Sequence, residues 1–255
     1  MTFHAGIDIG SRTVKLVLLE DGRISKVAVR DTTFDPMAVC RELLSNVDFQ
    51  SITATGYGRH LFSRERPCTL VSEIKAAAVG ARFLLPQCGM VLDVGGQDTK
   101  VITLDNGGYF NKFLMNDRCA AGTGRFLEVM ARALSYTYEQ FTDAALSATK
   151  AEKLNSMCTV FAESEVISLV ARGASREAIA LGIHESVATR TLSLMKGLSL
   201  SDTIMFAGGG ATNSCLCRKI EEGLGRALYV PENPRIVAAL GAALCNNGKE
   251  NGNGC

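Results

Sequence analysis

The chain carries an internal repeat that constrains its fold more than any other feature of the sequence. Residues 7–22 read Ile-Asp-Ile-Gly-Ser-Arg-Thr-Val-Lys-Leu-Val-Leu-Leu-Glu-Asp-Gly, and residues 92–107 read Leu-Asp-Val-Gly-Gly-Gln-Asp-Thr-Lys-Val-Ile-Thr-Leu-Asp-Asn-Gly. Each copy has an apolar strand that ends in Asp-x-Gly, a polar turn, a second apolar strand and an Asp-Gly or Asn-Gly hairpin signal. The repeat predicts two related halves, each of which opens with a β-meander.

The rest of the chain shows helical segments alternating with short apolar strands, which predicts an α/β fold. Third strands are expected at Arg23–Arg30 and Tyr109–Leu114, and further strands at Ser51–Thr55, Thr203–Ala207 and near Ala227–Val230. The predicted helices are Asp35–Asn46, Ser72–Leu85, Arg125–Leu134, Tyr138–Ala148, Val160–Arg172, Arg176–Leu198, Ser214–Leu224 and about Pro234–Cys245.

We expect the halves to span residues 1–87 and 88–233, because the Pro86-Gln-Cys-Gly89 turn is a natural boundary between them. The last helix, 234–245, is predicted to pack back on the first half. The Asn/Gly-rich residues 246–255 are predicted to form a flexible tail.

Composition excludes several classes of protein. The formal charge of +1 over 255 residues argues against a nucleic-acid binder, and no apolar run approaches the roughly 18 residues that a membrane span needs. The N-terminus lacks the basic and apolar regions of a signal peptide. A cytoplasmic location is therefore predicted, where the nine cysteines indicate metal or redox chemistry more than disulfides.

The two Asp-x-Gly turns are candidate phosphate sites, since glycine lets exposed backbone N–H groups approach an anion closely. Asp8 and Asp93 are placed to hold Mg²⁺ through water. An ordinary tight hairpin is the alternative for either turn alone, and two copies at one offset favour phosphate binding. No Gly-x-x-x-x-Gly-Lys-Ser/Thr loop is present, so the chain is not a P-loop protein. The predicted phosphate-contacting residues are Gly10, Ser11, Arg12, Thr13, Val14, Lys15, Gly95 and Gly96.

A third candidate is Phe206-Ala-Gly-Gly-Gly-Ala-Thr-Asn213, where a strand runs through three glycines into a helix. The bare backbone of Gly209 and Gly210 would let an adenosine or ribose lie against it. A flexible turn is the alternative for such a triplet.

Two cysteines precede predicted helices. Cys119 lies in a small-residue turn before Arg125–Leu134, and Cys158 precedes Val160–Arg172. Free N–H groups at a helix start favour a thiolate and any anionic cluster that it holds. Two unrelated buried thiols are the alternative. Cys215 and Cys217 form no closed site by themselves and are read as incidental.

The three Gly motifs together resemble the first phosphate, second phosphate and adenosine motifs of the superfamily of acetate and sugar kinases, heat-shock ATPases and actin. Asn116-Asp-Arg-Cys-Ala-Ala-Gly-Thr-Gly-Arg125 and Cys158-Thr-Val-Phe-Ala-Glu-Ser-Glu-Val166 resemble the activators of 2-hydroxyacyl-CoA dehydratases and the ATPase subunits of benzoyl-CoA reductases. The resemblance runs from Gly6 to Leu244. It implies two ribonuclease H-like (actin-like ATPase) subdomains around a nucleotide cleft.

The resemblance further implies a homodimeric, oxygen-sensitive ATPase with one 4Fe-4S cluster between its subunits. Cys119 and Cys158 would be half of its ligands, because a cubane cluster usually needs four thiolates and a two-fold axis supplies the other pair. ATP/ADP, Mg²⁺, a flavodoxin or ferredoxin donor, and a dehydratase or reductase acceptor are the implied cofactors and partners.

In this reading Asp8, Gln97 and Asp98 are the catalytic candidates, the last two for positioning the attacking water or metal. Arg12 stands where such loops usually carry Ser or Thr. Two other classes stay open: a small-molecule kinase of the same superfamily, and a regulatory nucleotide-binding module without catalysis. A kinase would need a carboxylate base on an inserted loop, and the short chain shows no such insertion.

Overall fold

The computed structural model of the protein describes residues 1–105, 107–117, 122–154 and 159–246. The chain forms two compact units. The first comprises residues 1–91, 102–112 and 231–255, and the second comprises residues 92–101 and 113–230. Cys119, Cys158 and all but the first residue of the predicted tail lie outside the described residues. The predicted limits of the two halves stay predictions.

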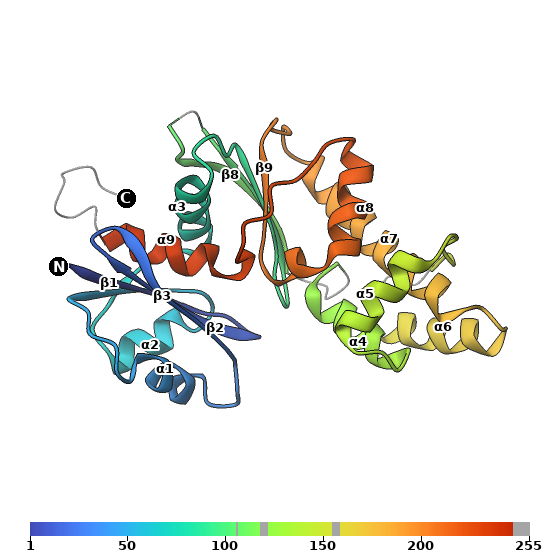
Figure 1. Ribbon diagram of the computed structural model, residues 1–255, viewed down its shortest axis with the longest axis horizontal. Coiled ribbons are helices and arrows are strands. Elements are labelled where there is room, and N and C mark those ends of the chain that lie inside the picture. The colour runs from blue at the N-terminus through green and yellow to red at the C-terminus, as the bar shows by residue number, and fades with distance from the viewer. Residues whose placement is uncertain (106, 118–121, 155–158, 247–255) are drawn as a thin grey trace. The chain divides into compact units, whose positions relative to one another are not determined.

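The first unit contains a five-stranded sheet in the order β3-β2-β1-β4-β5 (Figure 1). Strands β1, β2 and β3 form the predicted antiparallel meander, and β4 adds parallel to β1. In chain order, the strands are β1 Phe3–Ile9, β2 Thr13–Glu20, β3 Arg23–Asp31, β4 Ser51–Thr55 and β5 Thr69–Leu70.

The two faces of this sheet have separate cores because side chains alternate along a strand. Ala5, Ile7 and Ile9 of β1 face helix α1 (Pro36–Leu44), in an apolar cluster that includes Met37, Cys40 and Leu43. The opposite face packs against helix α9 (Val237–Asn246), where Val17 and Leu19 meet Ala239, Leu240 and Ala243. Figure 1 shows α1 and α2 (Arg59–Glu65) on one side of the sheet and α9 on the other.

Helix α9 approaches its neighbours at backbone distance. A Cβ placed on Gly6 of β1 would lie 2.0 Å from the carbonyl oxygen of Ala239. Helix α3 (Glu73–Leu84) meets α9 in the same way, since a Cβ on Gly241 would lie 1.7 Å from the Ala76 oxygen. The small residues at these points therefore set how closely the C-terminal helix packs within the first unit.

The second sheet repeats this plan with strands in the order β8-β7-β6-β9. In chain order, its strands are β6 Met90–Val94, β7 Thr99–Leu104, β8 Phe110–Asn116 and β9 Ile204–Ala207. Strands β6, β7 and β8 correspond in order to β1, β2 and β3, and β9 lies beside β6 as β4 lies beside β1. The sequence repeat is thus confirmed as a repeat of strand order. The helices described in the second unit are α4 Gly124–Ala133, α5 Tyr138–Ser147, α6 Thr159–Ala171, α7 Arg176–Met195 and α8 Ser214–Leu224.

The structure corrects the sequence prediction at three places. The strand expected near Ala227–Val230 is only a single bridge between Met205 and Tyr229, and Pro231 follows directly, which cannot donate a ladder hydrogen bond. The last predicted helix begins as a 3-10 turn at Pro234–Ile236 before α9. Helix α2 and the two-residue strand β5 were not predicted, because elements this short carry almost no periodicity.

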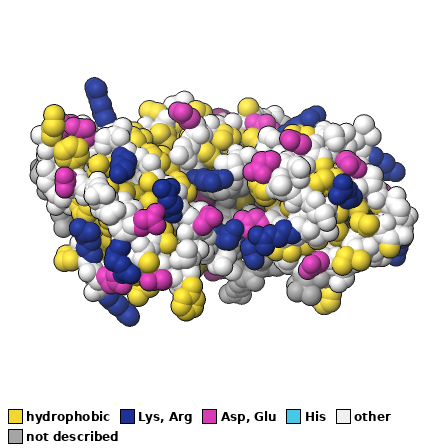
Figure 2. All heavy atoms as spheres, turned by 60° about the horizontal axis from the view of Figure 1, so that its bottom comes forward, with side chains coloured by type: hydrophobic (Ala, Val, Ile, Leu, Met, Phe, Trp, Pro, Cys, Tyr) yellow, Lys and Arg dark blue, Asp and Glu magenta, His cyan; other side chains and the backbone are white. Residues whose placement is uncertain are grey.

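The surface shows no segregation of charge on the face drawn in Figure 2, where Lys and Arg side chains are interspersed with Asp and Glu. This agrees with the net charge of +1. Among the described residues, no helix combines the length and the apolar character that crossing a membrane requires.

Candidate nucleotide-binding site

The first Asp-x-Gly turn joins β1 to β2 and is closed by its own backbone. The Gly10 N–H donates to the Thr13 carbonyl oxygen at 3.1 Å. Asp8 lies opposite Lys15 in the antiparallel register, and the Lys15 ammonium donates to Asp8 Oδ2 at 2.8 Å. Asp8 is 3% exposed, and its second oxygen, Oδ1, has no hydrogen-bond partner among the described residues. A buried carboxylate oxygen without a donor suits a metal-bound water that the protein does not itself supply.

The second turn, between β6 and β7, is closed by the same backbone hydrogen bond. The Gly95 N–H donates to the Asp98 carbonyl oxygen at 2.9 Å, at the position that matches the Gly10 contact. The Lys100 ammonium lies 2.6 Å from Asp98 Oδ1 in a pair that is almost fully buried. Both turns are therefore closed by a glycine N–H and contain a Lys–Asp pair. The aspartates are not equivalent, because Asp98 matches Thr13 of the first turn and not Asp8.

Glycine is required in each turn because a side chain would collide with other atoms of the turn. A Cβ on Gly10 would lie 2.9 Å from the Thr13 oxygen and 3.0 Å from Lys15 Nζ. A Cβ on Gly95 would lie 2.7 Å from Asp98 Oδ1. These contacts lie inside each turn and explain why it carries glycine, and phosphate binding at the turns stays a prediction.

The glycine triplet after β9 is held against the second turn. Gly208 has a φ of +82°, and a Cβ there would lie 2.2 Å from Asp93 Oδ1. A Cβ on Gly210 would lie 2.6 Å from the Val94 side chain. Gly209 differs from both, because it is exposed and a Cβ on it would meet no atom within 4 Å. The open side of Gly209 is where a flat ligand could lie on the backbone.

A counterpart of this triplet follows β4 and was missed in the sequence. Gly56 has a φ of +85°, and a Cβ there would lie 2.3 Å from Asp8 Oδ1. A Cβ on Gly58 would lie 2.3 Å from Ile9 Cγ2. Gly56 and Gly58 thus contact Asp8 and Ile9 as Gly208 and Gly210 contact Asp93 and Val94. The Gly-Tyr-Gly spacing after an apolar strand was the available signal.

The remaining predicted residues are placed less uniformly. Ser11, Arg12 and Thr13 are half-buried in the first turn, whereas the Val14 side chain is buried in the apolar core and leaves only its backbone for a ligand. In the second turn Gly96 is half-buried and Gln97 is exposed at the tip. Asp98 is 4% exposed and is occupied by Lys100.

Helix α4, which follows the Cys119 segment, begins on the second turn. The Gly124 N–H donates to the Gly95 oxygen at 2.9 Å, and the Arg125 N–H donates to the Gly96 oxygen at 3.0 Å. The Thr99 hydroxyl donates to the Gly122 oxygen at 2.8 Å. Three hydrogen bonds therefore tie the start of α4 to the second Asp-x-Gly turn and the first residue of β7.

The predicted cluster ligands, Cys119 and Cys158, lie outside the described residues. No group of three His, Cys, Asp or Glu side chains with metal-site geometry occurs in the part of the chain that the structure describes. Burial raises the pKa of both Cys215 and Cys217 to about 11. A protonated, buried thiol is a poor ligand and nucleophile, which agrees with reading this pair as incidental.

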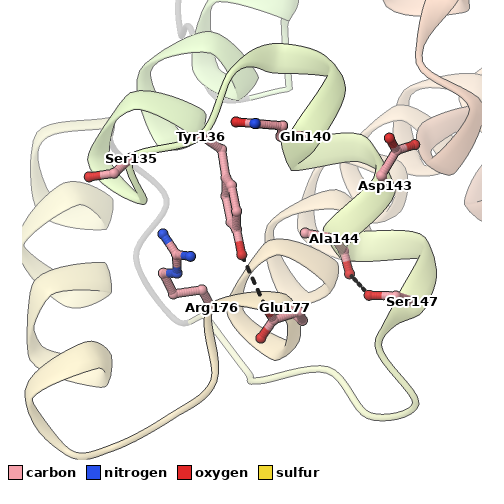
Figure 3. A pocket seen from close by; sticks show the side chains of 8 residues that line it. All are labelled: Ser135, Tyr136, Gln140, Asp143, Ala144, Ser147, Arg176 and Glu177. Carbon is pink, nitrogen blue, oxygen red and sulfur yellow. Dashed lines mark hydrogen bonds between the residues drawn. The ribbon is translucent and has the colours of Figure 1, made fainter.

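A pocket of about 580 Å³ lies elsewhere in the second unit, lined from α5 and the start of α7 (Figure 3). The Tyr136 hydroxyl donates to Glu177 at 3.1 Å, and the Arg176 guanidinium lies 4.4 Å from the Tyr136 ring centre. Its side chains thus bind one another, and none of the predicted nucleotide-binding residues lines it.

Comparisons with known proteins match almost the whole chain. The 2-hydroxyisocaproyl-CoA dehydratase activator of Clostridioides difficile is 38% identical over 251 residues, which cover 95% of this chain and 94% of that protein. The (R)-2-hydroxyglutaryl-CoA dehydratase activating ATPase of Acidaminococcus fermentans is 40% identical over 251 residues, covering 95% and 96%. A benzoyl-CoA reductase subunit of Thauera aromatica is 31% identical over 266 residues, covering 96% and 93%.

A solved structure agrees with the sequence comparisons. The activator of the 2-hydroxyisocaproyl-CoA dehydratase from Clostridium difficile with bound ADPNP superposes with a TM-score of 0.90 at 37% identity, covering 98% of this chain and 96% of that one. The predicted actin-like ATPase fold is thereby confirmed. The model of the BadF/BadG/BcrA/BcrD ATPase family matches residues 5–246, and the chain belongs to that family.

Proposed function

We propose that this protein is an ATP-dependent one-electron donor that activates a 2-hydroxyacyl-CoA dehydratase or a related reductase. Its predicted redox centre is a 4Fe-4S cluster that bridges a homodimer through Cys119 and Cys158. A flavodoxin or ferredoxin is the proposed electron source. The names of the relatives support the activation of a dehydratase, and the steps below rest on the described residues.

Nucleotide binding is supported by the two turns and the glycine triplet. The half-buried Ser11, Arg12 and Thr13 of the first turn suit phosphates, and the open face of Gly209 suits an adenosine. The related activator that carries ADPNP superposes over nearly its full length. In this reading Ser11, Arg12 and Lys15 contact phosphate, and the exposed Gln97 positions the attacking water.

The Mg²⁺ that accompanies ATP fits the first turn. Asp8 offers one buried carboxylate oxygen that has no partner among the described residues, while Lys15 holds the other oxygen at 2.8 Å. Mg²⁺ keeps most of its water shell and is usually bound by few carboxylates. When bound, it would neutralise phosphate charge. Asp98 holds Lys100 and would keep that cation beside the second turn.

The observation that carries the proposal is the attachment of α4 to the second phosphate turn. The carbonyl groups of Gly95 and Gly96, and the Thr99 hydroxyl, bind the backbone of residues 122–125 directly. A nucleotide that moves this turn must move the start of α4, because three hydrogen bonds link them. The Cys119 segment immediately precedes residue 122, so nucleotide state and redox centre share one short connection.

The proposed dimer is supported by exposed apolar side chains on α6, the helix that follows Cys158 in the sequence. Phe161, Ile167 and Val170 are 67%, 61% and 45% exposed, although all three are apolar. Exposed apolar side chains on the helix that follows a predicted ligand cysteine suit contact with a second copy of the chain, which would bring the other two thiolates. When bound, the cluster would supply the one-electron carrier.

Anaerobic purification tests the cluster. The wild-type protein should contain about four irons per dimer and show a dithionite-reduced EPR signal. Cys119→Ala and Cys158→Ala should each lose both, whereas the matched control Cys217→Ala should keep them. Iron-free wild-type protein after anaerobic reconstitution would overturn the proposal.

A second experiment tests the connection between turn and helix. Thr99→Val keeps the side-chain shape and removes the hydrogen bond to Gly122. We expect ATP-dependent electron delivery to an acceptor to fall by roughly threefold or more, with ATP hydrolysis changed by less than about twofold. Thr103→Val, on the same strand but bound to Lys112, is the control. Equal effects of the two variants would refute the connection.

Two alternative functions, a small-molecule kinase and a subunit of a benzoyl-CoA reductase-like complex, predict different results. A small-molecule kinase would release a phosphorylated compound, whereas the proposed donor releases only ADP and phosphate. A benzoyl-CoA reductase-like subunit would require other subunits for ATP-driven reduction. Isolation of a stable complex with such subunits would favour that alternative, to which the Thauera aromatica relative points.

A further inference from the structure

A fully buried histidine in the second unit lies directly behind the glycine triplet. His184 of α7 is 0% exposed, and its ring packs against the Phe141 ring of α5 at 4.6 Å between centres. Neither residue belongs to any motif used so far. A buried imidazole needs partners for both ring nitrogens, and these partners identify what the histidine does.

The hydrogen bonds of His184 fix its tautomer. Nδ1 lies 2.8 Å from the Ala180 carbonyl oxygen, which can only accept, so Nδ1 carries the proton. Nε2 lies 3.0 Å from the Asn213 amide nitrogen and accepts a hydrogen from it. Burial lowers the pKa of His184 to about 4, which agrees with a neutral ring that accepts at Nε2.

Both polar atoms of the Asn213 side chain form hydrogen bonds. Its amide nitrogen also donates to the Thr142 hydroxyl of α5 at 3.0 Å, and its Oδ1 accepts from the Leu216 N–H at 2.8 Å as the N-cap of α8. Asn213 is itself 0% exposed. Its side-chain position is therefore set by three helices, and any one lost bond leaves a buried polar atom short of a partner.

Asn213 is also the last residue of the glycine segment. Its own N–H donates to the Gly210 oxygen at 3.1 Å, and residues 209–212 between Gly208 and Asn213 form a 3-10 turn. The segment is consequently held at both ends, by Asp93 and Val94 at Gly208 and Gly210, and by His184 and Thr142 through Asn213.

We propose that His184 and Thr142 are positioning residues for the nucleotide: they hold Asn213 and so fix the glycine segment on which the adenosine lies. The inference deepens the proposed function and rests on it. Neither side chain touches the ligand, because both are buried behind the segment. They set the affinity for the nucleotide and leave the phosphate chemistry at Asp8 and the second turn unchanged.

Isothermal titration of the full-length protein with ADP and Mg²⁺ tests the proposal, together with steady-state ATPase kinetics. Thr142→Val removes one hydroxyl and keeps the shape. We expect it to raise the Kd for ADP and the KM for ATP by roughly three- to tenfold, with kcat within about twofold of wild type. His184→Leu should raise both by about tenfold or more. His184→Gln, whose amide oxygen can accept from Asn213, should recover most of the affinity.

Thr191→Val is the matched control. Thr191 is also buried, lies on α7, and its hydroxyl has no hydrogen-bond partner among the described residues. This variant should leave the Kd for ADP within about twofold of wild type. Thermal melts of all variants separate loss of affinity from loss of folding, and Thr142→Val keeps the test intact if His184→Leu fails to fold.

The outcomes distinguish a failure of this inference from a failure of the proposed function on which it rests. Equal Kd values for Thr142→Val and Thr191→Val, or loss of stability with unchanged affinity in His184→Leu, would show that the network only supports the core. Wild-type protein that binds neither ADP nor ATP would instead overturn the proposed function itself.

Discussion

Replacing Gly56 with alanine should displace the carboxylate on which Mg²⁺ binding depends. The new Cβ would lie 2.3 Å from Asp8 Oδ1 and 2.6 Å from the Ile9 oxygen, whereas ordinary contacts begin at 3.4 Å. Because β1 is a central strand paired on both sides, the Asp8 side chain must yield by about 1 Å. A misplacement of this size costs on the order of 100-fold in rate at an active site.

Gly22→Ala separates this displacement from backbone strain. Gly22 has a φ of +80°, close to the +85° of Gly56, but a Cβ on it would meet no atom within 4 Å. Both variants should lose about 1–2 kcal/mol of unfolding free energy from the left-handed backbone. Gly56→Ala should lose more than Gly22→Ala, because its Cβ also overlaps the Ile9 carbonyl group, and only Gly56→Ala should lose activity. A second control, Gly58→Ala, crowds the Ile9 side chain without touching Asp8.

The assay is ATP hydrolysis at saturating Mg²⁺ and ATP, with urea unfolding of each variant in parallel. We expect kcat of Gly56→Ala to fall about 100-fold and that of Gly22→Ala to stay within about twofold. Gly58→Ala should fall between them. The reasoning is refuted if Gly56→Ala and Gly22→Ala have equal kcat while Asp8→Asn is inactive, because Gly56 would then not determine where Asp8 lies.

Three further results are expected. Gly209→Val should abolish ADP binding in calorimetry, since the side chain enters open space where the ligand would lie. Its unfolding free energy should stay near that of wild type, and undiminished ADP binding would show that the adenosine does not bind at Gly209. Because the folded-state pKa of His184 is lowered from 6.5 to about 4, its contribution to stability is complete above pH 6.5 and is lost as pH falls toward 4. Urea unfolding at pH 5 should show a deficit of about 2 kcal/mol relative to pH 7.5 that His184→Gln lacks, and parallel pH profiles of the two proteins would contradict this. Gly241→Ala should lose about 2–4 kcal/mol in urea unfolding because its Cβ would overlap the Ala76 oxygen, and a loss below about 0.5 kcal/mol would show that α3 and α9 separate easily.

The two Asp-x-Gly turns were predictable because the residues that form them are close together in the sequence. Asp8, Gly10 and Lys15 lie within one hairpin, so strand alternation and turn propensity place them together without knowledge of the rest of the fold. The same holds for the second copy. The longer helices were also predicted to within a few residues, since several turns of apolar periodicity mark each of them.

The contact of Gly56 and Gly58 with the first turn was not predicted from the sequence, for a physical reason. Gly56 and Gly58 lie beside Asp8 and Ile9 only because β4 pairs in parallel with β1. Helices α4 to α7 separate β8 from β9 in the second half, so the offset of 85 that relates the meanders does not relate the glycine loops. A parallel pairing between distant segments has no signature in local sequence.

What the sequence by itself determined is the repeated meander, its two Asp-x-Gly turns and the membership of a family, because these depend on residues close together in the chain. Only the tertiary structure decided which buried side chains support the glycine segment. His184 and Thr142 come from two helices and Asn213 from the N-cap of a third, and they showed no spacing pattern. The desolvation of each polar group nevertheless forces the three to satisfy one another. Burial is a property of the folded chain, and partners chosen by burial become visible only once the helices are packed.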